Sequence, residues 1–176
     1  MQNRILSCPV PSNINPLSPN GFMFSIQRLP AVSFFCQEVN LPAVSLPAIG
    51  MATPFVNYPI AGDIMDFGEL NIQFLVDSEM SNYKAIFNWL RGLGFPEDNA
   101  QYTEQVTTQI PTAEVAASTS DATLTILGSN SLPVQTIQFI DLVPVSIDSL
   151  TFTSTSQDVQ YLIGNASFKY AYYKFV

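Results

Sequence analysis

The sequence contains no histidine, and this absence removes a large part of enzyme chemistry. Serine and cysteine nucleophiles usually need an imidazole base, and many metal sites need an imidazole ligand. There are two cysteines, Cys8 and Cys36, too few for a disulfide scaffold and too far apart for a zinc site. Glycine-rich phosphate-binding motifs are also missing. We therefore expect two free thiols, no cofactor, no metal and no enzymatic activity.

Positive charge is scarce as well. The 176 residues include 6 Lys and Arg against 14 Asp and Glu, a formal net charge of −8, and charged residues make up only 11% of the chain. A surface that grips phosphate needs clustered cations, so we expect no direct nucleic-acid binding. Plentiful Ser, Thr, Asn and Gln replace part of the missing surface charge, and a second contribution is expected from surface that is hidden against other subunits.

Long apolar runs are absent too. No run approaches the roughly 20 residues that span a bilayer, and no apolar segment precedes the cysteine of Leu6-Ser-Cys8, as an export signal would require. We expect no membrane association, and a protein that stays in the cytoplasm unless it is assembled into a particle that leaves it.

Acidic residues gather between Asp63 and Glu69, where Asp66-Phe67-Gly68 matches the magnesium-binding signature of protein kinases. The companion kinase motifs are missing, so the three-letter match is weak. Gly62 and Gly68 argue against a helix that would place these acids on one face. A glycosidase-type carboxylate pair is a weaker alternative that spacing alone does not exclude, because such sites usually lie beside aromatic and basic substrate contacts in a deep cleft. A calcium site is also weaker, because the register of Asp63 to Glu69 does not match the twelve-residue loop pattern.

The length fits one domain. Residues 1–21 carry four prolines and are expected to form an extended N-terminal arm, followed by a single domain over 22–176. Two strands, Phe22–Arg28 and Val32–Glu38, are predicted to form a hairpin through a turn at Leu29-Pro30-Ala31. The next segment, 41–62, mixes four prolines with apolar residues and cannot be a central strand. It either folds over the core or projects and buries itself on a neighbouring subunit.

The remaining chain has clearer periodicity. Alternation over Leu70–Val76 predicts a half-buried antiparallel strand, and apolar spacing from Tyr83 to Leu93 predicts a helix that places Trp89 in the core. A long loop or insertion is expected at about 97–133. Further strand signals cover Thr123–Leu127, Val134–Leu142, Ser149–Ser154 and Val159–Phe175. The predicted fold is mainly β, an antiparallel sandwich or barrel with one flanking helix.

The order of these features resembles that of the tail tube proteins of contractile-tailed bacteriophages. The resemblance rests on Phe34-Phe-Cys-Gln37, Leu41-Pro-Ala43, Ile60-Ala-Gly-Asp63, Val76-Asp77, Ile86-Phe-Asn-Trp89, Leu142-Val-Pro-Val145 and the closing run Ala166–Phe175. It implies hexameric rings that stack into a hollow virion tube, assembled in the host cytoplasm, with tail sheath and baseplate proteins as partners. DNA would pass through the lumen without specific binding.

The resemblance also implies that the segment 41–62 contacts the adjacent ring. The expected contact residues are Leu41, Pro42, Val44, Leu46, Pro47, Ile49, Met51, Phe55 and Ile60. An acidic lumen would keep DNA from adhering, and the candidate lining acids are Glu69, Asp141, Asp148 and Asp158. Each acid can equally be part of an ordinary solvated face.

Two alternatives to the tube subunit stay open at this point. One is a tube-initiating component of the baseplate. The other is an oligomeric β-sandwich module that binds carbohydrate or protein, with exposed tyrosines such as Tyr172 and Tyr173 as contact platforms.

Overall fold

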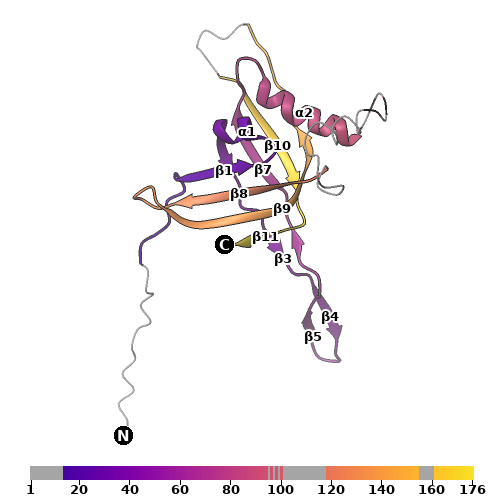
Figure 1. The fold of residues 1–176 in the computed structure, drawn as a ribbon. Coiled ribbons are helices and arrows are strands. Elements are labelled where there is room, and N and C mark those ends of the chain that lie inside the picture. Colours follow the sequence, from indigo (N-terminus) through magenta and orange to yellow (C-terminus); the bar gives the residue numbers. More distant parts are fainter. Residues whose placement is uncertain (1–13, 95, 97, 99, 101–117, 155–160) are drawn as a thin grey trace.

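The computed structural model describes residues 14–94, 96, 98, 100, 118–154 and 161–176 (Figure 1). Of the predicted N-terminal arm, only 14–21 are described, and 14–20 are exposed and form neither helix nor strand. Of the long loop or insertion predicted at 97–133, residues 98, 100 and 118–133 are described, and 120–127 form a strand instead. In chain order the elements are β1 (Phe22–Ile26), α1 (Pro30–Phe35), β2 (Cys36–Val39), β3 (Val44–Ser45), β4 (Ala48–Ala52), β5 (Asn57–Ala61), β6 (Asp66–Phe67), β7 (Leu70–Leu75), α2 (Ser81–Gly94), β8 (Ser120–Leu127), β9 (Pro133–Ile147), β10 (Ile163–Lys169) and β11 (Tyr172–Phe175). The prediction of a mainly antiparallel β fold is confirmed.

The long strand β9 belongs to two sheets. Its first half pairs with β8 and β11, and β1 pairs with β8, which gives the first sheet the order β1-β8-β9-β11. Its second half pairs with β10, which gives the second sheet the order β9-β10-β7-β2. Asp141 lies between the two halves with a φ of 56°, a backbone conformation that turns the strand out of its regular course.

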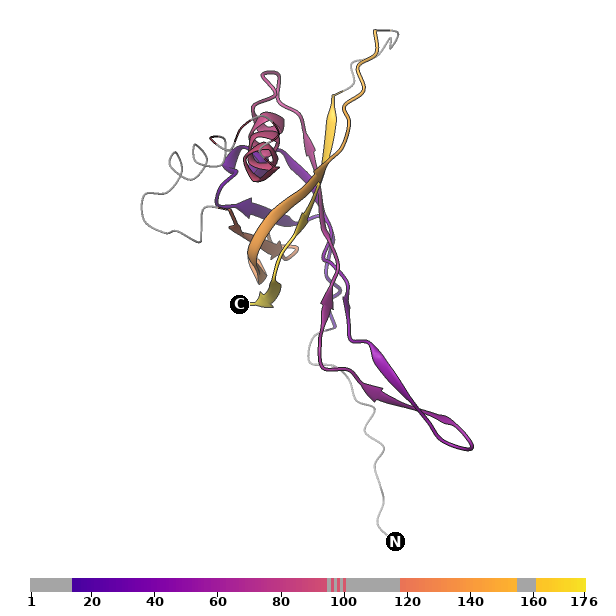
Figure 2. The same cartoon turned by 90° about the vertical axis from the view of Figure 1, so that its right-hand side faces the viewer.

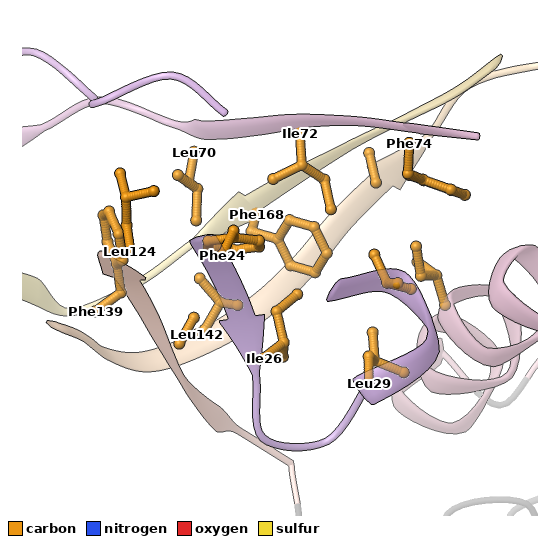
Figure 3. Close-up of a cluster of buried hydrophobic side chains, with 14 of the residues drawn as sticks. Phe24, Ile26, Leu29, Leu70, Ile72, Phe74, Leu124, Phe139, Leu142 and Phe168 are labelled. Atoms are coloured by element: carbon orange, nitrogen blue, oxygen red, sulfur yellow. The ribbon is translucent and has the colours of Figure 1, made fainter. Parts of the chain in front are cut away.

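The core lies between the two sheets and the helices (Figure 3). Leu70, Ile72 and Phe74 all point inward from β7, as the alternation predicts. The helix α2 adds Ile86 and Trp89, and the Trp89 ring lies 6.2 Å from the ring of Phe168 on β10. The helix α2 therefore covers the face of the second sheet from which Phe168 points, and the core role predicted for Trp89 is confirmed.

Asn82 is the buried polar side chain that joins α2 to the sheet. Its amide donates to the carbonyl oxygen of Leu75 at 2.6 Å, while its Oδ1 accepts from the backbone N–H of Asp77 at 3.3 Å and of Tyr83 at 2.8 Å. These bonds fix the start of the helix against the end of β7. Among the described residues, neither helix combines the length and the apolar character that crossing a membrane would demand.

The predicted hairpin at the start of the domain is wrong. Residues 30–35 form the helix α1, and β1 and β2 do not pair with each other, because β1 pairs with β8 and β2 pairs with β7. Pro30 stands at the first turn of the helix, where its fixed φ is tolerated. The Ser33 hydroxyl accepts from the Ile26 N–H at 3.0 Å and donates to the Leu29 carbonyl at 3.3 Å.

Two other strand predictions need correction. Residues 149–154 form no strand, and β9 instead continues to Ile147. The predicted last strand is divided at Tyr170 and Ala171 into β10 and β11, which pair with different halves of β9. The division changes which side chains face inward, so Phe168 is buried whereas Tyr172 is exposed.

Candidate assembly surfaces

Residues 41–68 leave the second sheet as a narrow ribbon, which we call the arm (Figure 2). Near the body, β3 pairs with β6, and farther out β4 pairs with β5 in a hairpin. At the tip, the Thr53 N–H donates to the Val56 carbonyl at 3.2 Å and closes the turn. Of the two arrangements left open by the sequence, the segment therefore projects and does not fold over the core.

Glycines mark the two points where the arm changes its strand pairing. The Gly62 N–H donates to the Pro47 carbonyl at 2.8 Å, and a Cβ on Gly62 would lie 2.4 Å from that oxygen. The Gly68 N–H donates to the Ala43 carbonyl at 2.9 Å, where a Cβ would lie 3.3 Å from the oxygen. A side chain at Gly62 cannot fit without displacing the backbone opposite.

The arm is mostly apolar and exposed, and its two charged residues are Asp63 and Asp66. No charged residue occurs from Leu41 to Gly62, every residue of β4 and β5 is exposed, and the Phe55 side chain at the tip is 98% exposed. The predicted contact residues that are exposed are Leu41, Val44, Leu46, Pro47, Ile49, Met51, Phe55 and Ile60. Pro42 is the exception, because it is buried at the root, where its carbonyl accepts from the Tyr173 hydroxyl at 3.5 Å.

An aromatic cluster anchors the root of the arm to the body. The ring of Phe67 lies 5.7 Å from that of Tyr173 and 6.1 Å from that of Tyr170, and Phe139 lies 5.1 Å from Tyr170. The Tyr170 hydroxyl is buried and has no hydrogen-bond partner among the described residues. Burial, with a further contribution from Tyr173, raises the pKa of Tyr170 to about 12. Tyr170 and Tyr173 lie within the predicted last strand, but their contact with the arm could not be predicted, because it joins residues that are far apart in the sequence.

The second sheet has one face, opposite α2, that no element of the described chain covers (Figure 2). Strand register places polar residues there, since Gln73 pairs with Asn165 and Asn71 pairs with Ser167. We call this the polar face. Its polar and charged members are Glu38, Glu69, Asn71, Gln73, Ser146, Asp148, Asn165, Ser167 and Lys169, and the same register adds the apolar Leu75, Val143 and Ile163. Three acids and one cation give it an acidic balance.

Hydrogen bonds join the side chains of the polar face. The Asn71 N–H donates to Asn40 Oδ1 at 2.6 Å, and the Ser167 hydroxyl donates to Asn71 Oδ1 at 2.7 Å. The Lys169 Nζ lies 3.6 Å from Glu69 Oε1, an exposed ion pair that contributes little to stability. The Asn71 amide oxygen and the Ser167 hydroxyl are thus partly occupied with one another.

The structure brings together two of the four predicted lumen acids. Glu69 lies on the polar face, and so does Asp148, which accepts from the Asn165 amide at 3.1 Å. Asp141 is exposed beside β8, where it accepts from the Thr119 hydroxyl at 3.3 Å. Asp158 lies outside the described residues.

The second sheet also has two open edges. Within the described part of the chain, β2 pairs only with β7, and residues 143–147 of β9 pair only with β10. Unpaired N–H and C=O groups along such edges can accept a strand from another chain. The sequence could not reveal these edges, because periodicity alone does not give strand order.

Groups with catalytic potential are not gathered anywhere in the described residues. There, no three His, Cys, Asp or Glu side chains are placed to hold a metal ion, and Asp63 and Asp66 are both exposed on the arm. Cys36 is a free, half-buried thiol. Burial raises the pKa of Cys36 to about 11, so the thiolate is rare near neutral pH.

Comparisons with known structures agree with this architecture. A chain in the cryo-EM structure of the sheath-tube complex of an extracellular contractile injection system (PVC), in its extended state, superposes with a TM-score of 0.61 at 13% identity, covering 92% of this chain and 91% of that one. A chain in the 6-fold symmetrised baseplate of the anti-feeding prophage gives 0.59 at 15% identity, covering 92% and 96%. A chain in the sheath/tube terminator of the PVC system gives 0.62 at 14% identity, covering 92% and 97%. At these identities the likeness shows the fold alone.

Comparison at the level of sequence gives the family. No curated protein matches the chain significantly. The family model described as phage tail tube protein matches residues 10–176, nearly the whole sequence. Proteins of this kind are structural components of tubes and not enzymes, in agreement with the absence of catalytic groups expected from the sequence. The chain belongs to the phage tail tube protein family.

Proposed function

We propose that the protein assembles into hexameric rings that stack into the hollow inner tube of a contractile phage tail, through which DNA is delivered. The observation that carries this proposal is the polar face of the second sheet, which no described element covers and which carries more acids than cations. The inner wall of such a tube must let DNA, a polyanion, slide past it. This requires a hydrated wall of like charge, because cations on the wall would bind the DNA phosphates through counterion release.

Ring closure is the role that we assign to the open edges. The β2 edge of one copy would pair with the 143–147 edge of β9 in the next copy, which continues the second sheet around the ring. Such a head-to-tail contact uses two different surfaces, and it closes when the rotation between neighbours divides a full turn. Both edges belong to the sheet that carries the polar face, so pairing them would place that face on a continuous inner wall.

The outer partners follow from the same orientation. With the polar face inward, α2 lies on the outside, where a sheath would surround the tube. We propose sheath and baseplate proteins as partners, a virion location and assembly in the host cytoplasm. The similar structures include a chain of a sheath-tube complex, which supports a sheath as partner.

A position at one end of the tube is the second candidate. Similar folds occur in the anti-feeding prophage baseplate and in the terminating cap of its tube, the latter at a TM-score of 0.60 and 11% identity. A tube-initiating subunit would form a ring that starts growth but would not extend into long tubes by itself.

Electron microscopy of the purified protein tests the assembly. We expect sixfold rings that stack into hollow tubes as the protein concentration rises. Single rings that never stack would favour the baseplate role, and a protein that remains monomeric at every concentration would contradict both roles.

Labelling of the assembled protein tests the lumen. In a Cys8→Ser, Cys36→Ser background, a cysteine at Gln73 should react with a small maleimide in tubes but not with a maleimide carried on a large polymer. A cysteine at Lys84, which is exposed on α2, serves as the control and should react with both. Equal reaction of both positions with the large reagent would contradict the lumen assignment.

A further inference from the structure

The polar face includes one cation among its described residues, Lys169 on β10, beside three acids. On a surface that DNA passes, a free cation is the group that would bind it, because each Lys or Arg that neutralises a phosphate releases counterions. The Lys169 side chain is 63% exposed, so burial does not hide its charge. The groups beside Lys169 therefore decide whether this surface lets DNA slide.

Strand register sets Glu69 opposite Lys169. The antiparallel pairing of Phe168 with Leu70 continues by one residue to Lys169 and Glu69. Because successive side chains point to opposite faces of a sheet, and Phe168 and Leu70 are buried on the core side, both charged side chains lie on the polar face. The Lys169 Nζ lies 3.6 Å from Glu69 Oε1. The two residues therefore form a close pair without net charge.

Asn40 holds the backbone that presents Glu69. Its side-chain amide donates to the Glu69 carbonyl at 3.1 Å, and its Oδ1 accepts from the Asn71 N–H at 2.6 Å. Asn40 directly follows β2, the strand that pairs with β7. These two bonds tie the start of β7 to the neighbouring strand, so the sheet fixes the place of Glu69 although this residue lies just before the regular strand.

The other two acids of the polar face lie too far from Lys169 to replace Glu69. The Asp148 N–H donates to the Asn165 carbonyl, and Asn165 lies four residues from Lys169 on β10, roughly 13 Å along the strand. Glu38 lies on β2, which β7 separates from β10, so it is about 10 Å away across the sheet alone. At 0.1 M salt the Debye length is about 10 Å, so charges at these distances are largely screened.

We infer that Glu69 masks the charge of Lys169 from DNA that passes the polar face. The pair presents a dipole instead of a free cation, and the potential of a dipole falls off faster with distance than that of a single charge. An exposed pair contributes little to stability, so the effect of Glu69 lies in what the surface binds. The inference rests on the proposed tube and gives Glu69 and Asp148 different roles, which an acidic balance alone would not.

Retention of short duplex DNA by tubes at low salt, measured by co-sedimentation, tests the masking. Glu69→Gln leaves Lys169 without its carboxylate and should retain roughly tenfold more DNA than the wild type, because each copy then offers a cation to the phosphates. Asp148→Asn is the matched control. It removes one acid from the same face but keeps the pair, and its retention should stay near the wild-type level.

Two further variants separate masking from a structural role of Glu69. Glu69→Gln combined with Lys169→Gln removes the whole pair and should return DNA retention to the wild-type level. Glu69→Asp keeps a carboxylate opposite Lys169 and should also remain near that level. A variant that does not form tubes alone is measured in tubes that are co-assembled with wild-type copies, so that its effect on DNA retention is still read.

The outcomes separate the inference from the proposed function. Equal retention by the Glu69→Gln and Asp148→Asn tubes, or retention by Glu69→Gln that survives the loss of Lys169, would overturn the masking and leave the tube standing. A wild-type protein that forms neither rings nor tubes would overturn both.

Discussion

Tyr170 combines burial, aromatic packing and a hydroxyl without a partner. Its ring lies against Phe67, Phe139 and Tyr173, so its aromatic part contributes to the anchor of the arm. Its hydroxyl is desolvated without a compensating hydrogen bond among the described residues, which is unfavourable for the folded state. The ring and the hydroxyl therefore act in opposite directions on stability.

Removal of that hydroxyl is expected to stabilise the protein. Tyr170→Phe keeps the ring and should raise the free energy of unfolding by about 1 kcal/mol in urea denaturation. Tyr173→Phe is the matched control and should not stabilise, because its hydroxyl donates to the Pro42 carbonyl. A loss of stability in Tyr170→Phe would mean that the hydroxyl has a partner in the folded protein.

The same residue predicts an alkaline effect. The folded protein holds the Tyr170 proton more tightly than the unfolded chain, since its pKa is raised from 10.0 to about 12. Ionisation of this group therefore leaves the free energy of unfolding unchanged below pH 10, and it lowers that free energy as pH rises toward 12. The wild type should lose stability more steeply than Tyr170→Phe across this range.

Among the elements, those with a clean period were predictable from sequence. The alternation in β7 and the helical spacing in α2 each reflect one apolar face on a common core. α1 was missed because Val32, Phe34 and Phe35 favour strands, and a six-residue helix is decided by tertiary contacts. Proline and apolar composition identified the arm.

The polar face could not be predicted, because it joins residues from four strands and periodicity does not give register.

The joint at Gly62 offers a test of the arm as an element. Gly62→Ala places a Cβ against the Pro47 carbonyl and should break the bond between them, so tube formation should fall severalfold. The body should keep its stability within about 0.5 kcal/mol, because Gly62 belongs neither to the core nor to the aromatic cluster at the root of the arm. Gly50→Ala is the control, since no atom lies within 4 Å of its Cβ position. Equal assembly of both variants, measured by sedimentation, would contradict the role of the joint.

For the whole molecule, net charge opposes association. Rings and tubes bring many copies of charge −8 together, and the apolar contacts must exceed that repulsion. Screening shortens from about 30 Å at 0.01 M salt to about 10 Å at 0.1 M. The concentration needed for assembly should therefore fall as salt rises over this range, as measured by light scattering. A rise in that concentration would indicate that attractive ion pairs hold the copies together.

Charge reversal on the polar face tests its relation to DNA. Tubes of the Glu69→Lys, Asp148→Lys variant should retain short duplex DNA at low salt and release it as salt rises, whereas wild-type tubes should retain none. The control, Glu79→Lys with Asp141→Lys, changes the net charge equally at exposed positions off the polar face. Retention measured by co-sedimentation should be several times weaker in the control. Equal retention would place Glu69 and Asp148 outside the lumen.

The glycine joint in the arm has a mechanical consequence. At Gly62 the ribbon passes from the β3–β6 ladder to the β4–β5 ladder, and one backbone bond to Pro47 spans the change. Rotation there would strain few contacts, while the apolar tip beyond it and the aromatic anchor behind it stay in place. A tube linked through such joints is expected to have low bending stiffness, so that it can curve under load without its rings separating.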